Sequence, residues 1–359
     1  MATSRKSSAS TRRRGPAQPR VRRVNLALQG GGSHGAFTWG VVDRLLEDGR
    51  IGIDAISGTS AGSMNAAVIA QGALRGPDGA RQALHDFWQA IAAAGQRFNP
   101  VAAWTASLGL PADNPWQWAT EQWTHWLSCN FTPYQLNPLR LNPLRDLLLR
   151  HVDFERLQRE SPMRLFIAAT NVRSGKVKVF GVDEAITVDM VMASACLPDL
   201  FPAVEVDGEH YWDGGFMGNP VLFPLFYYPT SRDVVIVHVD PIRREALPRS
   251  AAEIRDRVNE ITFNASLMKE LRAVHFVQKL LHDGWIRDAH RAKLRDMLMH
   301  SIRADTVLAD LSAASKLRTD WGFLCDLRDR GRATAQDWLE RHFDALGRRS
   351  SVDLAAEFL

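Results

Sequence analysis

The sequence has few cysteines and no long apolar run, and both shortages narrow the class of protein. Its three cysteines, Cys129, Cys196 and Cys325, are far apart and match no metal-ligand spacing. This pattern argues against a disulfide framework or a zinc site and favours a reducing compartment. No segment approaches the roughly 18 apolar residues of a membrane span, and residues 26–28 run into glycines instead of continuing as the core of a secretory leader. We expect a cytoplasmic protein that meets membranes, if at all, only at their surface.

Acidic residues are absent from the first 23 positions, which contain eight lysines and arginines. The rest of the chain holds 36 basic and 40 acidic residues, so the sequence pI of about 9.1 originates in this tail. A mildly acidic body is not built to bind nucleic acid through its surface. We interpret residues 1–23 as a disordered basic arm with affinity for anionic surfaces. Its composition also resembles an organelle transit peptide, which we keep as the alternative.

The remaining composition, 45% hydrophobic and 23% charged, excludes a fibrous or mostly disordered chain. Short aliphatic runs at residues 24–29 and 51–56 predict buried strands, and residues 36–47 and 64–70 have the apolar spacing of helices. This alternation of strand and helix is typical of an α/β fold with a parallel sheet. We therefore predict a three-layer sandwich around a central, mostly parallel sheet.

Later segments extend this pattern and interrupt it once. Further strands are predicted at residues 164–169, 176–180, 204–206, 210–212 and 234–239, with an Asp207-Gly208 hairpin turn. Residues 80–150 hold six of the eleven tryptophans, and we interpret them as a helical insertion whose tryptophans fill the core rather than face a membrane. From Ser250 onward the spacing is helical, and an apolar stripe begins with Ile254, Val258 and Ile261.

A glycine-rich loop follows the first predicted strand. Its sequence, Gly30-Gly31-Gly32-Ser33-His34-Gly35, satisfies the G-x-G-x-x-G pattern of dinucleotide-binding loops. Backbone N–H groups of such a loop face outward at the start of a helix, where an anion is favoured. That anion could be a pyrophosphate or the oxyanion of an acyl-transfer intermediate, and the loop alone does not decide between them.

A second motif, Gly58-Thr59-Ser60-Ala61-Gly62, is G-x-S-x-G between a predicted strand and a predicted helix. This is the context of a nucleophile elbow, in which flanking glycines permit a sharp turn that exposes the serine hydroxyl. The plainer interpretation is a turn with Ser60 as a helix N-cap. A dinucleotide site would instead place an acidic residue at the end of the second strand, whereas Asp54 lies in the middle of that strand.

A third motif, Asp213-Gly214-Gly215, directly follows the second hairpin strand. A serine nucleophile needs a base, and a carboxylate at a strand end beside two glycines could act directly. The alternative is an ordinary Asp-Gly turn. His210 and His238 are available to complete a triad, but a histidine chosen from sequence is more often structural, and we assign neither.

Together the three motifs resemble those of the patatin-like phospholipase family. The stretch Ala193-Ser194-Ala195-Cys196-Leu197-Pro198 and the pair Phe201-Pro202 also resemble the segment that precedes the Asp-Gly motif in that family. The similarity spans residues 24–240 and implies lipid acyl hydrolase activity through a Ser–Asp dyad, with no histidine, metal or other cofactor. By this resemblance we expect a catalytic domain at residues 24–240 that is preceded by the arm, and a helical extension at residues 241–359 that packs on it.

The resemblance also implies a role for each motif residue. Ser60 is the expected nucleophile, in the elbow formed with Gly58 and Gly62, and Asp213 is the expected proton acceptor. The expected oxyanion hole is lined by Gly30, Gly31 and Gly32.

One position departs from the family pattern. Many members have arginine or lysine in the glycine-rich motif where this chain has His34, whose side chain ordinarily titrates near neutrality. Both a phospholipid and a neutral acyl ester are therefore candidate substrates. Two rival functions stay open: a dinucleotide-dependent oxidoreductase, which leaves the second and third motifs unexplained, and a non-catalytic protein that binds anionic surfaces through its arm.

Overall fold

The computed structural model describes residues 21–98, 131–138, 142–291 and 294–359. Its strands form one eight-stranded sheet in the order β5-β6-β3-β2-β1-β7-β8, with β4 paired to β3. Strands β3, β2, β1, β7 and β8 are parallel, and β4, β5 and β6 are antiparallel to their neighbours. The strand bounds are β1 Arg22–Leu28, β2 Ile51–Thr59, β3 Arg164–Asn171, β4 Val177–Phe180, β5 Val204–Val206, β6 Glu209–Asp213, β7 Asp233–His238 and β8 Leu298–Arg303.

Helices connect and cover these strands. The α-helices are α1 Gly35–Asp48, α2 Ala61–Ala73, α3 Pro77–Phe98, α6 Pro133–Leu136, α7 Pro143–His151, α8 Phe154–Glu160, α9 Val188–Ser194, α10 Phe223–Tyr227, α11 Ala251–His282, α12 Asp288–Arg291, α13 Trp321–His342 and α14 Leu354–Phe358. Four short 3-10 helices are η1 Gly32–His34, η2 Gly214–Phe216, η3 Ala313–Leu317 and η4 Phe343–Ala345.

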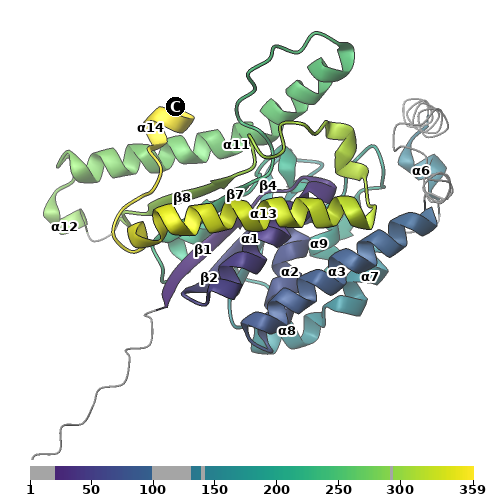
Figure 1. Cartoon of the computed structure of the whole chain (residues 1–359), viewed down its shortest axis with the longest axis horizontal. Coiled ribbons are helices and arrows are strands. Elements are labelled where there is room, and N and C mark those ends of the chain that lie inside the picture. The colour runs from purple at the N-terminus through teal and green to yellow at the C-terminus, as the bar shows by residue number, and fades with distance from the viewer. Residues whose placement is uncertain (1–20, 99–130, 139–141, 292–293) are drawn as a thin grey trace, which may run out of the picture.

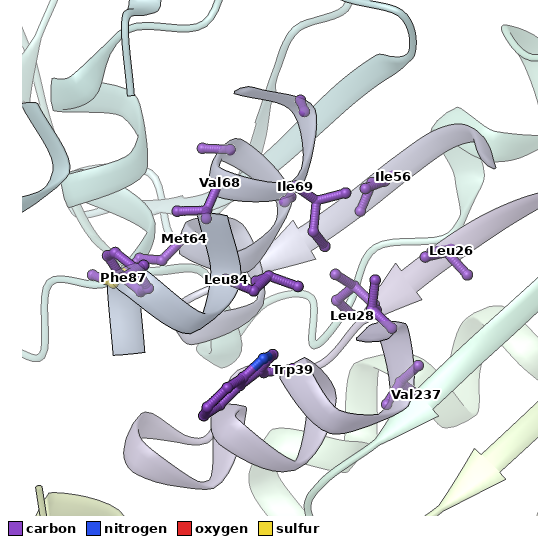
Figure 2. Close-up of a cluster of buried hydrophobic side chains, with 14 of the residues drawn as sticks. Leu26, Leu28, Trp39, Ile56, Met64, Val68, Ile69, Leu84, Phe87 and Val237 are labelled. Atoms are coloured by element: carbon purple, nitrogen blue, oxygen red, sulfur yellow. The ribbon is translucent and has the colours of Figure 1, made fainter. Parts of the chain in front are cut away.

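The sheet separates two hydrophobic cores, because alternate side chains of its strands point to opposite faces. In β1, Leu26 and Leu28 pack in the core with α1, α2, α3 and α13, whereas Ala27 packs in the core with α10, α11 and α14. Figure 1 shows α1, α2, α3 and α13 gathered on the viewer's side of the sheet. Figure 2 shows the first core, where Leu28 and Ile56 from the strands meet Leu84 and Trp39 from the helices. The predicted three-layer sandwich is confirmed.

Two local expectations are also confirmed. The helix predicted at residues 36–47 is α1, and Gly49 ends it in the left-handed conformation. The hairpin predicted at Asp207-Gly208 joins the antiparallel strands β5 and β6.

The arm is shorter than the sequence indicated. Arg22 and Arg23 are already part of β1 and pair with β2, and Arg23 also donates to the Ile53 carbonyl. Residues 1–20 lie outside the described residues. The prediction for the last two arginines of the arm was therefore wrong, because backbone pairing along the sheet outweighs their charge.

The C-terminal extension is not purely helical. Strand β8 pairs in parallel with β7 and lengthens the sheet, a strand that the helical spacing did not predict. The apolar stripe of α11 also splits. Leu271 and Val274 are buried, but Ile254, Val258 and Ile261 are about half exposed, at 47%, 56% and 55%. In Figure 1 the first turns of α11 project beyond the sheet, which leaves these side chains without a layer to cover them.

The tryptophan-rich segment is described only in part. Trp88 lies in α3, is 3% exposed and donates its indole N–H to Asn65, so the core interpretation is confirmed for this residue. The other five tryptophans of the segment, Trp104, Trp116, Trp118, Trp123 and Trp126, lie outside the described residues. No helix among the residues that are described is long and apolar enough to cross a membrane.

Candidate active site

Strand pairing carries the three motifs to one edge of the sheet. Leu28 at the end of β1 pairs with Gly58 of β2, and the next residue of β2, Thr59, pairs with β3. Asp213, on the antiparallel strand β6, pairs with Ala169 near the same end of β3. Ligand sites in such sheets form beyond the carboxyl ends of the parallel strands. The glycine loop, Ser60 and the Asp213 turn therefore meet at the edge where a site is expected.

Ser60 occupies a strained turn between β2 and α2. Its backbone has φ 54° and ψ −124°, a conformation that non-glycine residues rarely adopt. The flanking glycines are required by space: a Cβ would lie 2.5 Å from the Gly62 carbonyl oxygen if placed on Gly58, and 2.2 Å from the Leu28 carbonyl oxygen if placed on Gly62. Although Ser60 precedes the first residue of α2, its side chain makes no capping hydrogen bond. The hydroxyl is thus free of the role that the plainer N-cap interpretation gives it.

The segment around Ser194 holds both motif residues from one side. The Ser60 N–H donates to the buried Ser194 hydroxyl at 2.9 Å, and the Asp213 N–H donates to the Cys196 carbonyl at 2.8 Å. From sequence, this segment was identified only by its resemblance to the family and had no assigned role. Ser194 is a single serine there, and pattern alone does not connect it to Ser60.

Asp213 is completely buried. Its Oδ1 accepts the Gly215 N–H at 2.7 Å, while Oδ2 is buried without a well-formed hydrogen bond. Burial raises the pKa of Asp213 to about 6, and the neighbouring Ser60 hydroxyl and Gly215 N–H oppose this rise. Ser60 is thus near enough to act on the carboxyl group, although no hydrogen bond of standard geometry joins its hydroxyl to Asp213 Oδ2. Such loose geometry is common in sites without substrate.

The glycine loop lies directly against Ser60. A Cβ on Gly30 would be 2.6 Å from the Ser60 Cβ, so only glycine permits this approach. The Gly30 N–H is already used, because it donates to Asn219 Oδ1 at 2.7 Å. Within the described part of the chain, the N–H groups of Gly31 and Gly32 have no intramolecular partner. Of the three predicted oxyanion-hole glycines, these two offer free donors and Gly30 offers close approach.

The residue type of His34 predicted a side chain whose charge titrates near neutrality. The structure contradicts this prediction. It is 5% exposed, and burial, together with Lys316 and Arg244, lowers its pKa to about 3. Its Nε2 lies 2.7 Å from the Ser315 hydroxyl, which itself donates to the Ser312 carbonyl. With its pKa lowered to about 3, the His34 ring is neutral at neutral pH, whichever ring nitrogen carries the proton.

The two histidines considered for a triad lie elsewhere. His238 is buried and stacks on Phe358, and burial lowers its pKa to about 3. His210 lies on β6, where its charged neighbour is Glu205 at 3.9 Å. Among the described residues, no histidine makes a hydrogen bond to Ser60 or Asp213.

A Ser–His–Asp arrangement does occur at the opposite end of the strands. His300 Nε2 lies 2.9 Å from Asp233 Oδ1, and its Nδ1 lies 3.0 Å from the Ser351 hydroxyl. The imidazole is fully buried, and Asp233 also accepts the Gly347 N–H. These contacts fasten the chain after α13 to β7 and β8. Neither the glycine loop nor a strained serine turn lies beside them.

Asp54, the acidic residue that a dinucleotide site would use, is engaged in other contacts. Asp54 Oδ2 accepts the N–H groups of Thr230 and Ser231 and the Thr230 hydroxyl, and Asp54 also pairs with Arg23. Since β2 ends at Thr59 beside the glycine loop, Asp54 lies five residues before that end, near the middle of its strand, where it makes structural contacts. It is not placed to hold a ribose hydroxyl. No three metal-binding side chains converge among the residues that the structure describes.

Comparison with known proteins agrees with this geometry. The family model described as "Patatin-like phospholipase" matches residues 26–226, more than half of the chain. The chain belongs to the patatin-like phospholipase family. Membership supports lipid acyl hydrolase activity, and all three motifs lie within the matched residues. No curated protein matched the chain.

Two solved structures match most of this chain at low sequence identity. VipD from Legionella pneumophila is 16% identical with a TM-score of 0.43, and the match covers 89% of this chain and 67% of VipD. ExoU, solved in its heterodimeric complex with SpcU from the type III secretion system of Pseudomonas aeruginosa, is 17% identical with a TM-score of 0.39. That match covers 90% of this chain but only 52% of the ExoU chain.

Proposed function

We propose that this protein is a serine hydrolase that cleaves carboxylic esters of lipids through a Ser60–Asp213 dyad. In the first step Ser60 Oγ attacks the ester carbonyl while its proton passes to the Asp213 carboxylate. The N–H groups of Gly31 and Gly32, with the positive end of α2, stabilise the resulting oxyanion. Collapse of this intermediate breaks the ester bond, and the departing alcohol takes the proton from Asp213.

The second step regenerates the enzyme. Water attacks the acyl group on Ser60 and gives a proton to Asp213. The second tetrahedral intermediate releases the fatty acid, and the proton returns to Ser60 Oγ. Each proton that Asp213 accepts is passed on within the same half-reaction, so no further acid or base is needed.

The observation that carries this proposal is a buried Asp213 whose pKa is raised. Beside it lies the Ser60 hydroxyl, which makes no helix-capping hydrogen bond. A serine hydroxyl is far less acidic than an ordinary aspartic acid, so proton transfer to Asp213 is uphill. Raising the carboxyl pKa to about 6 reduces that difference. Preorganised oxyanion donors contribute about 3–4 kcal/mol each in enzymes where they have been removed.

Domain roles follow from this proposal. We assign the reaction to residues 24–240 and assign residues 241–359 the task of completing the sheet and covering the glycine loop. We assign the basic arm a role in holding the enzyme at anionic lipid surfaces, where its positive charges are attracted. Family membership supports an acyl ester of a lipid as substrate, and phospholipids and neutral glycerides are the two classes to compare.

The test is release of fatty acid from a panel of phospholipids and neutral glycerides by the purified protein. Wild type should release fatty acid from at least one class, and Ser60→Ala should release none while keeping the circular dichroism spectrum and melting temperature. Ser174→Ala, at an exposed loop serine, is the matched control. Undiminished release by folded Ser60→Ala would overturn the proposal.

A further inference from the structure

A buried polar network lies behind the glycine loop. The Gln29 side chain donates to the Asn219 carbonyl at 3.1 Å and accepts the N–H groups of Val239 and Asp240. Asn219 accepts the Gly30 N–H through Oδ1 and donates through Nδ2 to Asp240 Oδ2 at 3.3 Å. Asp240 is only 2% exposed. The network therefore places a carboxylate two hydrogen bonds away from the glycine that touches Ser60.

The cation for this carboxylate comes from far along the chain. Lys316, in η3, forms an ion pair with Asp240 Oδ1. The same short helix contacts the glycine loop at two more points. The Lys316 carbonyl oxygen would lie 2.4 Å from a Cβ on Gly32, and the Ser315 hydroxyl is hydrogen-bonded to His34 Nε2 at 2.7 Å. All of η3 lies beyond residues 26–226, the part that matches the family model.

We propose that Lys316 is a positioning residue for the Ser60–Asp213 reaction, because its ammonium group neutralises Asp240 and so holds Asn219 and Gly30 in place under the oxyanion site. This inference rests on the proposed dyad and adds the C-terminal segment to the machinery. With His34 neutral, the cation that pairs with Asp240 in this network is Lys316, which lies outside the glycine loop.

Asp240 needs a paired cation because the proposed reaction creates an anion close to this carboxylate. An unpaired Asp240 carboxylate would repel both the developing oxyanion and the Asp213 carboxylate. Its charge raises the pKa of Asp213, and Lys316 lowers that pKa. Among the described residues, further ionisable groups near this cluster are His34, Arg244, Glu260, Asp310 and Cys196. Arg244 is occupied by Glu260, and burial keeps the Cys196 thiol protonated by raising its pKa to about 11.

The test is the pH dependence of kcat/KM for a short-chain nitrophenyl ester, measured from pH 4.5 to 9. Because Asp213 must be deprotonated to accept a proton, activity rises with pH through its pKa. Lys316→Met should move this acid limb up by about 0.5 pH unit or more, which is at least about a threefold loss at pH 5. Asp240→Asn should move the limb to lower pH. The double variant should return it close to the wild-type position, and Lys316→Arg should keep most of the activity.

Lys279→Met, which removes an exposed lysine from α11, is the matched control and should not move the limb. If Lys316→Met does not fold, the acid limbs of Asp240→Asn and of the double variant still test the proposal. Neither of these variants leaves a buried carboxylate unpaired. Limbs that coincide in all folded variants, or that move in the same direction for the two single changes, would overturn the role of Lys316. That result is distinct from failure of the proposed dyad, which would show as activity in Ser60→Ala.

Discussion

The burial of Asp213 makes a prediction about stability as well as activity. Its pKa rises from 3.8 to about 6 in the folded protein. The folded state therefore binds this proton more tightly than the unfolded state, so stability falls as pH rises through this window and the full cost is present above about pH 6. A difference of about two pH units corresponds to about 3 kcal/mol. Asp213→Asn removes the titrating group and with it this cost.

The assay compares urea unfolding of wild type and Asp213→Asn at pH 4.5 and at pH 8. The amide has its own constant effect on stability, which cancels when the two pH values are subtracted. We expect the variant to gain about 2 kcal/mol over wild type between pH 4.5 and pH 8, while its ester hydrolysis falls nearly to the level of Ser60→Ala. Asp183→Asn, at an exposed position, controls for removal of a carboxylate. Equal pH dependence in wild type and Asp213→Asn would refute the raised pKa and the reasoning built on it.

Three further predictions concern the Ser60 turn, the histidines and the basic arm. Gly62→Ala should lose ester hydrolysis and several kcal/mol of stability to denaturant, because its Cβ would meet the Leu28 carbonyl oxygen at 2.2 Å; Gly322→Ala, whose Cβ has no neighbour nearer than 3.9 Å, should lose neither. Four histidines are to be replaced singly by glutamine or alanine: His34, His210, His238 and His275. Each folded variant should be more active than Asp213→Asn in nitrophenyl ester assays, and one variant as inactive as Ser60→Ala would replace the dyad with a triad. Deletion of residues 1–20 should leave soluble ester hydrolysis intact and weaken sedimentation with anionic vesicles, by up to about 1 kcal/mol per lost charge; loss of soluble activity would contradict this.

The layers of the fold could be predicted from the sequence. The candidate site could be predicted in part, because its three motifs combine a local pattern with residue types suited to the chemistry. The glycine loop, the Ser60 elbow and the Asp213 turn each lie at a strand end, and they are brought together by the parallel pairing of β1, β2 and β3 and the antiparallel pairing of β6 with β3. Pattern could not give the contacts that bind these motifs to one another. Ser194 and Asn219 are ordinary polar residues in sequence, and only the folded chain shows that they hold the N–H groups of Ser60 and Gly30.

The C-terminal region was the least predictable, for physical reasons. Strand β8 is six residues long and contains a histidine and a serine, which do not mark a buried strand in sequence. Lys316 lies 76 residues from Asp240, and nothing in its own segment indicates that it pairs beneath the glycine loop. The neutrality of His34 depends on burial and on cations contributed by distant elements, whereas its residue type alone predicted a group that titrates near neutrality.

Covalent labelling asks directly whether Ser60 is the nucleophile, as we propose. A fluorophosphonate probe reacts with an activated serine, and peptide mass spectrometry after labelling identifies the residue. We expect one adduct, on Ser60, which is lost in Ser60→Ala and retained in Ser351→Ala. An adduct on Ser351, the serine of the buried Ser–His–Asp arrangement, or full labelling of Ser60→Ala would contradict it.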